Sequence, residues 1–164
     1  MFPIGINERG GRERRAAAPA THNSSTTAGA YACAAAESNA TRPARLRVLV
    51  VDDAPDVTEM IATLIRIAGY DVTTALSAAE AFDAARTDRF DAVVSDIGMP
   101  GMNGYQLAEA LRALPEYAHT PLVAVTGFTM YDDRERARLS GFDDFLSKPI
   151  NPSDLLDTLK RLCG

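Results

Sequence analysis

The sequence has few of the residues that cross-link chains or bind transition metals. Its 164 residues include two cysteines, Cys33 and Cys163, and two histidines. Two cysteines so placed form neither a disulfide framework nor a zinc-ligand pattern. We therefore expect both thiols to be free, as is usual in a reducing compartment.

Long apolar runs are absent as well. No stretch approaches the roughly 20 apolar residues that span a bilayer. The N-terminal segment also lacks the apolar stretch of a secretory signal. The sequence therefore predicts no membrane association, and the cytoplasm is the expected location.

Charge and composition divide the chain near residue 44. Residues 1–43 carry five Arg and three Glu, whereas residues 44–164 carry 12 Lys or Arg and 19 Asp or Glu, a net charge of −7. An acidic domain repels nucleic-acid phosphates, so we expect no nucleic-acid partner. Residues 1–43 are rich in small and polar residues and cannot bury enough surface to offset the entropy of ordering. We predict a disordered low-complexity tail over 1–43 and one folded domain over 44–164.

Strand-like and helix-like patterns alternate through the folded part. Short apolar, often β-branched runs predict strands, and apolar residues at helical spacing predict the helices between them. The expected strands cover 46–51, 71–75, 92–95, 121–125 and 142–147. Five strands alternating with five helices predict an α/β fold, a doubly wound parallel sheet with helices on both faces.

Local signals place the ends and faces of several helices. Pro55 suits a first helical turn, and Gly69 suits the position after the last turn. Ser77 and Glu80 form a capping-box pattern. The expected apolar stripe of the first helix consists of Val57, Met60, Ile61, Leu64, Ile65 and Ala68.

Polar side chains stand at the ends of four predicted strands. Asp52 and Asp53 follow the first, Asp96 the third, Thr126 the fourth and Lys148 the fifth. Because the carboxyl ends of parallel strands lie at one edge of a sheet, we expect the five to converge there. Each alone has an ordinary explanation as a turn residue, a structural hydroxyl or a surface charge. Together, with no comparable set at the opposite edge, they favour a functional site.

The residue types indicate the chemistry. Three neighbouring carboxylates repel one another, and a hard divalent cation relieves that repulsion. Mg²⁺ prefers oxygen ligands, and the absence of nearby His or Cys argues against zinc. Beside such a cation, Asp96 could attack phosphorus, while Lys148 and Thr126 hold phosphoryl oxygens.

The motifs of this edge, taken together, resemble the receiver domain of two-component response regulators. They are Val51-Asp52-Asp53, Ser95-Asp96-Ile97-Gly98-Met99-Pro100 with Gly104, Val125-Thr126-Gly127 and Ser147-Lys148-Pro149. The resemblance covers about residues 45–164. It implies a flavodoxin-like (βα)5 sheet with strand order 2-1-3-4-5.

The resemblance also implies roles for these residues. Asp96 accepts a phosphoryl group from the phosphohistidine of a histidine kinase or histidine phosphotransfer protein. Asp53, Asp96 and the backbone carbonyl of Gly98 bind Mg²⁺, and Asp52 acts mostly through water. Thr126 and Lys148 contact the phosphoryl oxygens.

Further implied features lie beyond the acceptor. Phe145 stands at the family's aromatic switch position, although a plain core aromatic is an equal reading. The resemblance implies a cis bond between Lys148 and Pro149. Gly98 and the apolar Phe128 lead us to expect slow hydrolysis of the acyl phosphate.

Other functional classes fit the residues less well. Haloacid-dehalogenase-like phosphatases need a second Asp two residues after the nucleophile, where this chain has Gly98. A Rossmann cofactor binder, or a flavodoxin-like electron carrier, would meet Asp52-Asp53-Ala54-Pro55 at the first turn, which repels phosphate. A phosphorylation-independent interaction module of receiver fold stays open as the alternative.

The output of the domain is expected to be protein binding. The sequence contains no effector domain after the fifth helix, so we expect a stand-alone receiver that catalyses only its own phosphorylation and slow dephosphorylation. The expected target surface is the fourth helix, fifth strand and fifth helix, with Arg134, Arg136, Arg138 and Phe145. The segment from Asp143 to Ile150 also resembles receivers fused to hybrid histidine kinases.

Overall fold

A computed structural model describes residues 44–127 and 131–164, which form a five-stranded parallel sheet in the order β2-β1-β3-β4-β5. The strands are β1 (Arg47–Val51), β2 (Asp71–Ala75), β3 (Ala92–Asp96), β4 (Leu122–Thr126) and β5 (Asp144–Ser147). The helices are α1 (Pro55–Ile67), α2 (Ala78–Thr87), α3 (Gly104–Arg112), α4 (Tyr131–Ser140) and α5 (Pro152–Cys163), with a short 3-10 helix, η1 (Pro115–Tyr117). The predicted flavodoxin-like fold and its strand order are confirmed.

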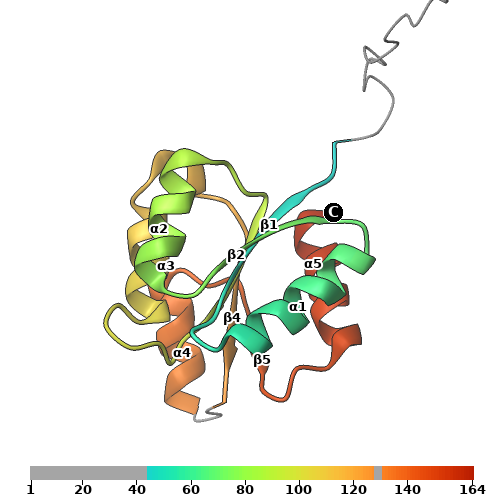
Figure 1. Ribbon diagram of the computed structural model, residues 1–164. Coiled ribbons are helices and arrows are strands. Elements are labelled where there is room, and N and C mark those ends of the chain that lie inside the picture. Colours follow the sequence, from blue (N-terminus) through green and yellow to red (C-terminus); the bar gives the residue numbers. More distant parts are fainter. Residues whose placement is uncertain (1–43, 128–130) are drawn as a thin grey trace, which may run out of the picture. The chain divides into compact units, whose positions relative to one another are not determined.

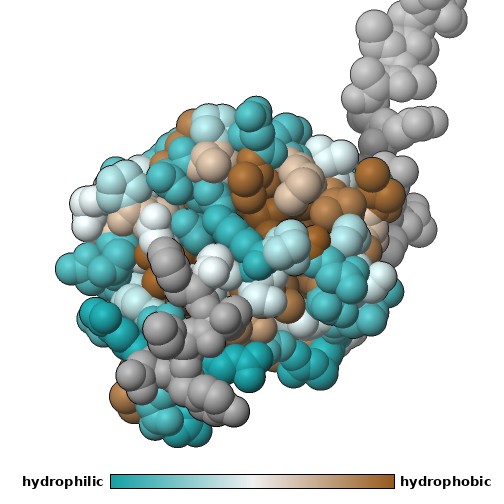
Figure 2. All heavy atoms as spheres, turned by 90° about the horizontal axis from the view of Figure 1, so that it is seen from below, coloured by the Kyte–Doolittle hydropathy of each residue, from teal (hydrophilic) through white to brown (hydrophobic). Residues whose placement is uncertain are grey.

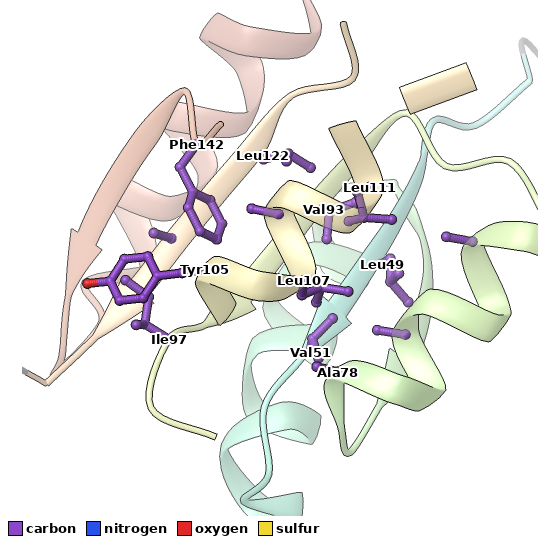
Figure 3. Packing of buried hydrophobic residues seen from close by; sticks show 14 of the residues in the cluster. Leu49, Val51, Ala78, Val93, Ile97, Tyr105, Leu107, Leu111, Leu122 and Phe142 are labelled. Carbon is purple, nitrogen blue, oxygen red and sulfur yellow. The ribbon is translucent and has the colours of Figure 1, made fainter. Parts of the chain in front are cut away.

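Helices cover both faces of the sheet (Figure 1). Helices α1 and α5 lie on one face, and α2, α3 and α4 lie on the other. Each face has its own hydrophobic core. In β1, Val48 and Val50 belong to the core on the side of α1 and α5, whereas Leu49 and Val51 belong to the core on the side of α2, α3 and α4, part of which Figure 3 shows. Burial on both faces explains why the central strands are apolar at every position rather than at alternate ones.

The buried face of α1 differs from the expected stripe. Met60 is 48% exposed, whereas Thr58, Ile61, Ala62 and Ile65 are buried. Ala68, which follows the last residue of α1, is exposed too. The predictions for Met60 and Ala68 were wrong because the pattern was ranked by side-chain hydrophobicity. The helix instead turns a threonine and an alanine toward the sheet, where small side chains allow close packing.

Caps and boundaries show smaller differences. The Ser77 side chain accepts the Glu80 N–H at 3.1 Å, but the Glu80 carboxylate accepts the N–H of Leu76 rather than that of Ser77. A complete capping box occurs instead at Asn103 and Gln106, at the start of α3. Helix α3 ends at Arg112, shortly before Pro115, which begins η1.

Three predictions concern residues outside the described ones, namely the disordered tail over 1–43, the free thiol of Cys33 and the effect of Phe128 on hydrolysis. In the described ranges, no helix has both the length and the apolar character needed to cross a membrane.

Candidate functional site

The predicted polar residues lie at one edge of the sheet. Asp52 directly follows β1, Asp96 and Thr126 are the last residues of β3 and β4, and Lys148 directly follows β5. This edge is at the bottom of Figure 1 and faces the viewer in Figure 2, where hydrophobic residues gather on one side of a largely hydrophilic surface. Asp52, Asp96 and Thr126 are buried, with 1%, 6% and 3% exposure, whereas Asp53 is exposed.

Three carboxylates form a group that fits a metal ion. One oxygen from each of Asp52, Asp53 and Asp96 lies within 4.8 Å of the others. Among the described residues, it is the one group of three or more His, Cys, Asp or Glu side chains with such spacing. An all-oxygen donor set, partly buried and partly open to solvent, suits Mg²⁺, which keeps several of its waters. The carbonyl of Gly98 as a further ligand stays a prediction.

Lys148 connects the two buried carboxylates. Its Nζ lies 2.8 Å from Asp52 Oδ2 and 3.1 Å from Asp96 Oδ1. Burial opposes the charge of this ammonium, but its hydrogen bonds to Asp52 and Asp96, and their negative charges, raise the pKa of Lys148 above the ordinary value. The side chain therefore stays cationic at the point where three acids meet.

Asp96 experiences opposing influences. Burial is the largest and raises the pKa of its carboxyl group, and the nearby charge of Asp52 adds to that rise. The hydrogen bond and charge of Lys148 act in the other direction without cancelling the effect of burial. The ionised form of Asp96 thus depends on cations close to it, because a buried carboxylate without a partner is costly.

The loop after β3 passes close to the acceptor strand. The Ser95 hydroxyl donates to the carbonyl oxygen of Asp96 at 2.9 Å, and the Gly104 N–H donates to the carbonyl oxygen of Ile97 at 3.0 Å. A Cβ at Gly104 would overlap the Asp96 carbonyl oxygen and lie 2.7 Å from Ile97 Cα. Gly104 therefore permits the backbone approach that closes this loop.

On the β4–β5 side of the site, aromatic rings contact arginines of α4. Phe145, in the middle of β5, is half-buried against the core that α2, α3 and α4 cover. The guanidinium of Arg134, on α4, lies 5.3 Å from the centroid of its ring, and that of Arg136 lies 4.5 Å from the ring of Tyr105. These arginine–aromatic contacts were not predicted from the sequence, because α4 has no strong apolar stripe to place its side chains.

The remaining sequence predictions have mixed outcomes. The peptide bond between Lys148 and Pro149 is cis, as predicted. The side chain of Thr126 lies at the expected edge, since its neighbour Val125 is paired with Asp96 across β3 and β4. The roles given to Thr126, Phe145 and Asp52 stay predictions.

Comparison with known proteins gives one consistent result. The model of the "Response regulator receiver domain" matches residues 48–160. The polar-differentiation response regulator DivK of Brucella anthropi is 33% identical over 117 residues, covering 71% of this chain and 95% of that protein. The chemotaxis protein CheY4 of Vibrio cholerae has a similar structure, with a TM-score of 0.71 and 36% identity over 73% of this chain and 99% of that one.

A second solved structure contains a metal. The receiver domain of the sensor histidine kinase PA1611 of Pseudomonas aeruginosa, described with a magnesium ion coordinated in its active-site cleft, is 30% identical with a TM-score of 0.69. It covers 74% of this chain and 99% of its own. The chain belongs to the response regulator receiver domain family, whose members are phosphoacceptor switches in two-component signalling.

Proposed function

We propose that Asp96 is the phosphoryl acceptor of this switch and that Mg²⁺ is its cofactor. One observation supports this most strongly. The ammonium of Lys148 lies 3.1 Å from Asp96 Oδ1, and Asp96 belongs to a group of three acids that each have one oxygen within 4.8 Å of the others. That arrangement brings a nucleophile, a fixed cation and metal ligands together.

The reaction is a transfer between two side chains. A carboxylate oxygen of Asp96 attacks the phosphorus of a phosphohistidine, forming a P–O bond while the P–N bond breaks. The departing imidazole takes the electron pair of the broken bond and a proton, and leaves as neutral histidine. Lys148 then moves from the Asp96 carboxylate toward a phosphoryl oxygen, where its charge offsets the new negative charge.

The acidic residues hold the metal in this proposal. Asp53, Asp96 and the carbonyl of Gly98 would hold the ion directly, and Asp52 would act mainly through water. When bound, the ion would supply electrostatic stabilisation to the phosphoryl oxygens. The same charge would favour the ionised form of Asp96, whose burial raises the pKa of its carboxyl group.

The response to phosphorylation is assigned to the β4–β5 side. Thr126 donates its hydroxyl to the phosphoryl group, and Phe145 turns from its half-exposed position toward the space that Thr126 leaves. The surface of α4, β5 and α5 changes as a result and binds a downstream target protein. A groove there is lined by Arg134, Ala137, Arg138, Phe142, Asp143, Asp144 and Phe145.

Receiver domains interact with histidine kinases and downstream targets. For this chain, the donor is proposed to be a histidine kinase or a histidine phosphotransfer protein, in the cytoplasm. The protein itself is no independent enzyme, since its chemistry changes only its own Asp96. A phosphorylation-independent interaction module would have no use for the complete set of Asp52, Asp53, Asp96 and Lys148.

Intact mass spectrometry tests this proposal. The full chain is incubated with Mg²⁺ and phosphoramidate, beside Asp96→Asn and the surface control Asp157→Asn on α5. We expect one phosphoryl adduct on the wild type and on Asp157→Asn, and none on Asp96→Asn. An unmodified wild type, or an equal adduct on Asp96→Asn, contradicts the proposal.

A further inference from the structure

The turn between β1 and α1 carries two of the three carboxylates of the site, yet its helix begins without a side-chain cap. The N-cap residue of α1 is Ala54, whose methyl group cannot accept a hydrogen bond. Asp52 and Asp53 directly precede it. Within the turn, the Asp52 side chain accepts the N–H of Ala54, and further contacts to Asp52 come from outside the turn.

Thr58 supplies such a contact from inside α1. Its hydroxyl Oγ1 lies 2.9 Å from the carbonyl oxygen of Asp52 and 2.9 Å from that of Ala54. Thr58 is buried, with 1% exposure, on the face of α1 that packs against the sheet. A hydroxyl buried at such a position needs a hydrogen-bond partner, whereas an apolar side chain would pack there without one.

The accepting carbonyl belongs to the peptide bond that joins Asp52 to Asp53. Tilting this peptide changes the ψ angle of Asp52 and the φ angle of Asp53, and so moves the two carboxylates relative to each other. The hydroxyl of Thr58 shares its one proton between the carbonyl of this peptide and that of Ala54, and so opposes the tilt. Its contact acts on both metal-ligand candidates at once, although the Thr58 side chain touches neither carboxylate.

The other polar groups of Asp52 already have partners. Its N–H donates to the carbonyl oxygen of Ala75 at 3.2 Å, and its Oδ1 accepts the N–H of Ala54 at 2.9 Å. Its Oδ2 accepts from Lys148 at 2.8 Å. The carbonyl held by Thr58 completes this set, so the residue is fixed at every polar atom.

We infer that Thr58 is a positioning residue of the metal site, whose hydroxyl fixes the Asp52–Asp53 peptide and so presents both carboxylates toward Asp96. This inference rests on the proposed function, because it takes Mg²⁺ as the ion bound there. It adds a residue outside the motifs of the site, which lies six residues after Asp52 and contacts it through the Asp52 carbonyl.

The test is the Mg²⁺ affinity of the full chain, measured by calorimetry without any phosphodonor. Thr58→Val removes the hydroxyl at nearly constant volume, and Thr58→Ser keeps it. Thr63→Val, on the exposed side of the same helix, is the matched control. We expect about tenfold weaker binding in Thr58→Val, the lower end of what losing an orienting partner of a metal ligand costs. Thr58→Ser and Thr63→Val should bind within about twofold of the wild type.

A thermal melt of each variant shows whether it is folded at the titration temperature. If Thr58→Val is not, Thr58→Ala takes its place and should show the same loss of affinity. Wild-type affinity in the variant without the hydroxyl overturns the inference, as does an equal loss in Thr58→Ser, which would assign the effect to the methyl group. A wild type that binds no Mg²⁺ overturns the metal part of the proposed function as well, so the two failures are distinguishable.

Discussion

The two edges of the sheet each place a basic side chain among oxygen atoms, in contrasting ways. At the carboxyl edge, Lys148 contacts two buried carboxylates, Asp52 and Asp96. At the opposite edge, Arg112 at the end of α3 donates mainly to backbone carbonyls. Its acceptors are Tyr117 O and Thr120 O at 2.7 Å, Gly141 O at 2.7 and 3.0 Å, and Asp143 Oδ2 at 2.8 Å.

The difference separates a structural contact from a reactive one. Apart from the carboxylate of Asp143, the partners of Arg112 are main-chain carbonyls of segments that precede β4 and β5, so its donors hold those segments together. The partners of Lys148 are acids that a metal ion or a phosphoryl group can also engage. Arg112, mainly among carbonyls, therefore stabilises the fold. Lys148, among carboxylates, can change its partner during a reaction.

We call the edge with Arg112 the structural edge and the carboxyl edge with Lys148 the reactive edge. The largest expected effect, on the free energy of unfolding, is at the structural edge. Arg112→Met leaves several carbonyls without their donor, and we expect a loss of about 3 kcal/mol in the free energy of unfolding. Mg²⁺ affinity should remain at the wild-type level, because the site lies at the other edge. Urea unfolding and calorimetry measure the two quantities, with exposed Arg138→Met as the control. A loss of Mg²⁺ affinity in folded Arg112→Met would break the separation of the edges.

A second test concerns the loop beside Asp96. Gly104→Ala places a Cβ against the backbone of Asp96 and Ile97, so the loop must shift, at a cost of about 2 kcal/mol in stability. Phosphorylation by phosphoramidate should slow as well. In Gly98→Ala, on the same loop, the Cβ would meet only Asp96 Oδ2 at 3.9 Å, an ordinary contact. Equal stability of the two variants would show that the close approach at Gly104 is unimportant.

The sequence was sufficient for the reactive edge because its chemistry resides in side chains at strand ends. Apolar runs located the strands, and the parallel order placed Asp52, Asp96, Thr126 and Lys148 together. The structural edge could not be predicted in this way. Its acceptors are carbonyl groups, which every residue has, so only the folded backbone shows that Arg112 reaches them.

Prediction from the sequence had a similar limit at the start of α1. Thr58 was not part of the predicted apolar stripe and Met60 was, but Thr58 is 1% exposed and Met60 is 48% exposed. Helical periodicity defines a stripe to within about one residue, and the backbone geometry of the turn then decides which side chain is buried. A buried threonine beside a helix start that lacks a capping side chain is the signal that could have been used.

A smaller effect, on affinity, is expected at Lys148. In Lys148→Met the carboxylates of Asp52 and Asp96 lose their ammonium partner, and Mg²⁺ no longer competes with it. We expect Mg²⁺ binding to strengthen about tenfold, which corresponds to about 1.4 kcal/mol, while binding of the phosphoryl mimic fluoroberyllate weakens. Calorimetry with each ligand measures both, with Lys160→Met on α5 as the control. Weaker Mg²⁺ binding would mean that the ammonium organises the acids instead of competing for them.

The smallest effect is expected on the switch side of the reactive edge. In Arg134→Met the Phe145 ring loses a cation–π contact worth about 0.5–1 kcal/mol. If that contact favours the half-exposed ring, fluoroberyllate with Mg²⁺ should bind about two- to fivefold more tightly to this variant. Arg138→Met, one turn further along α4, should bind like the wild type. Unchanged affinity in Arg134→Met would remove this contact from the account of the switch.

The most direct test of the contrast between the edges is to locate the phosphoryl group chemically. The full chain is phosphorylated with phosphoramidate in Mg²⁺ or in EDTA and then reduced with borohydride, which converts an aspartyl phosphate to homoserine. The account predicts homoserine at position 96 in the Mg²⁺ sample and aspartate there in the EDTA sample. Homoserine at another aspartate, or equal conversion of Asp96 without the metal, would contradict it.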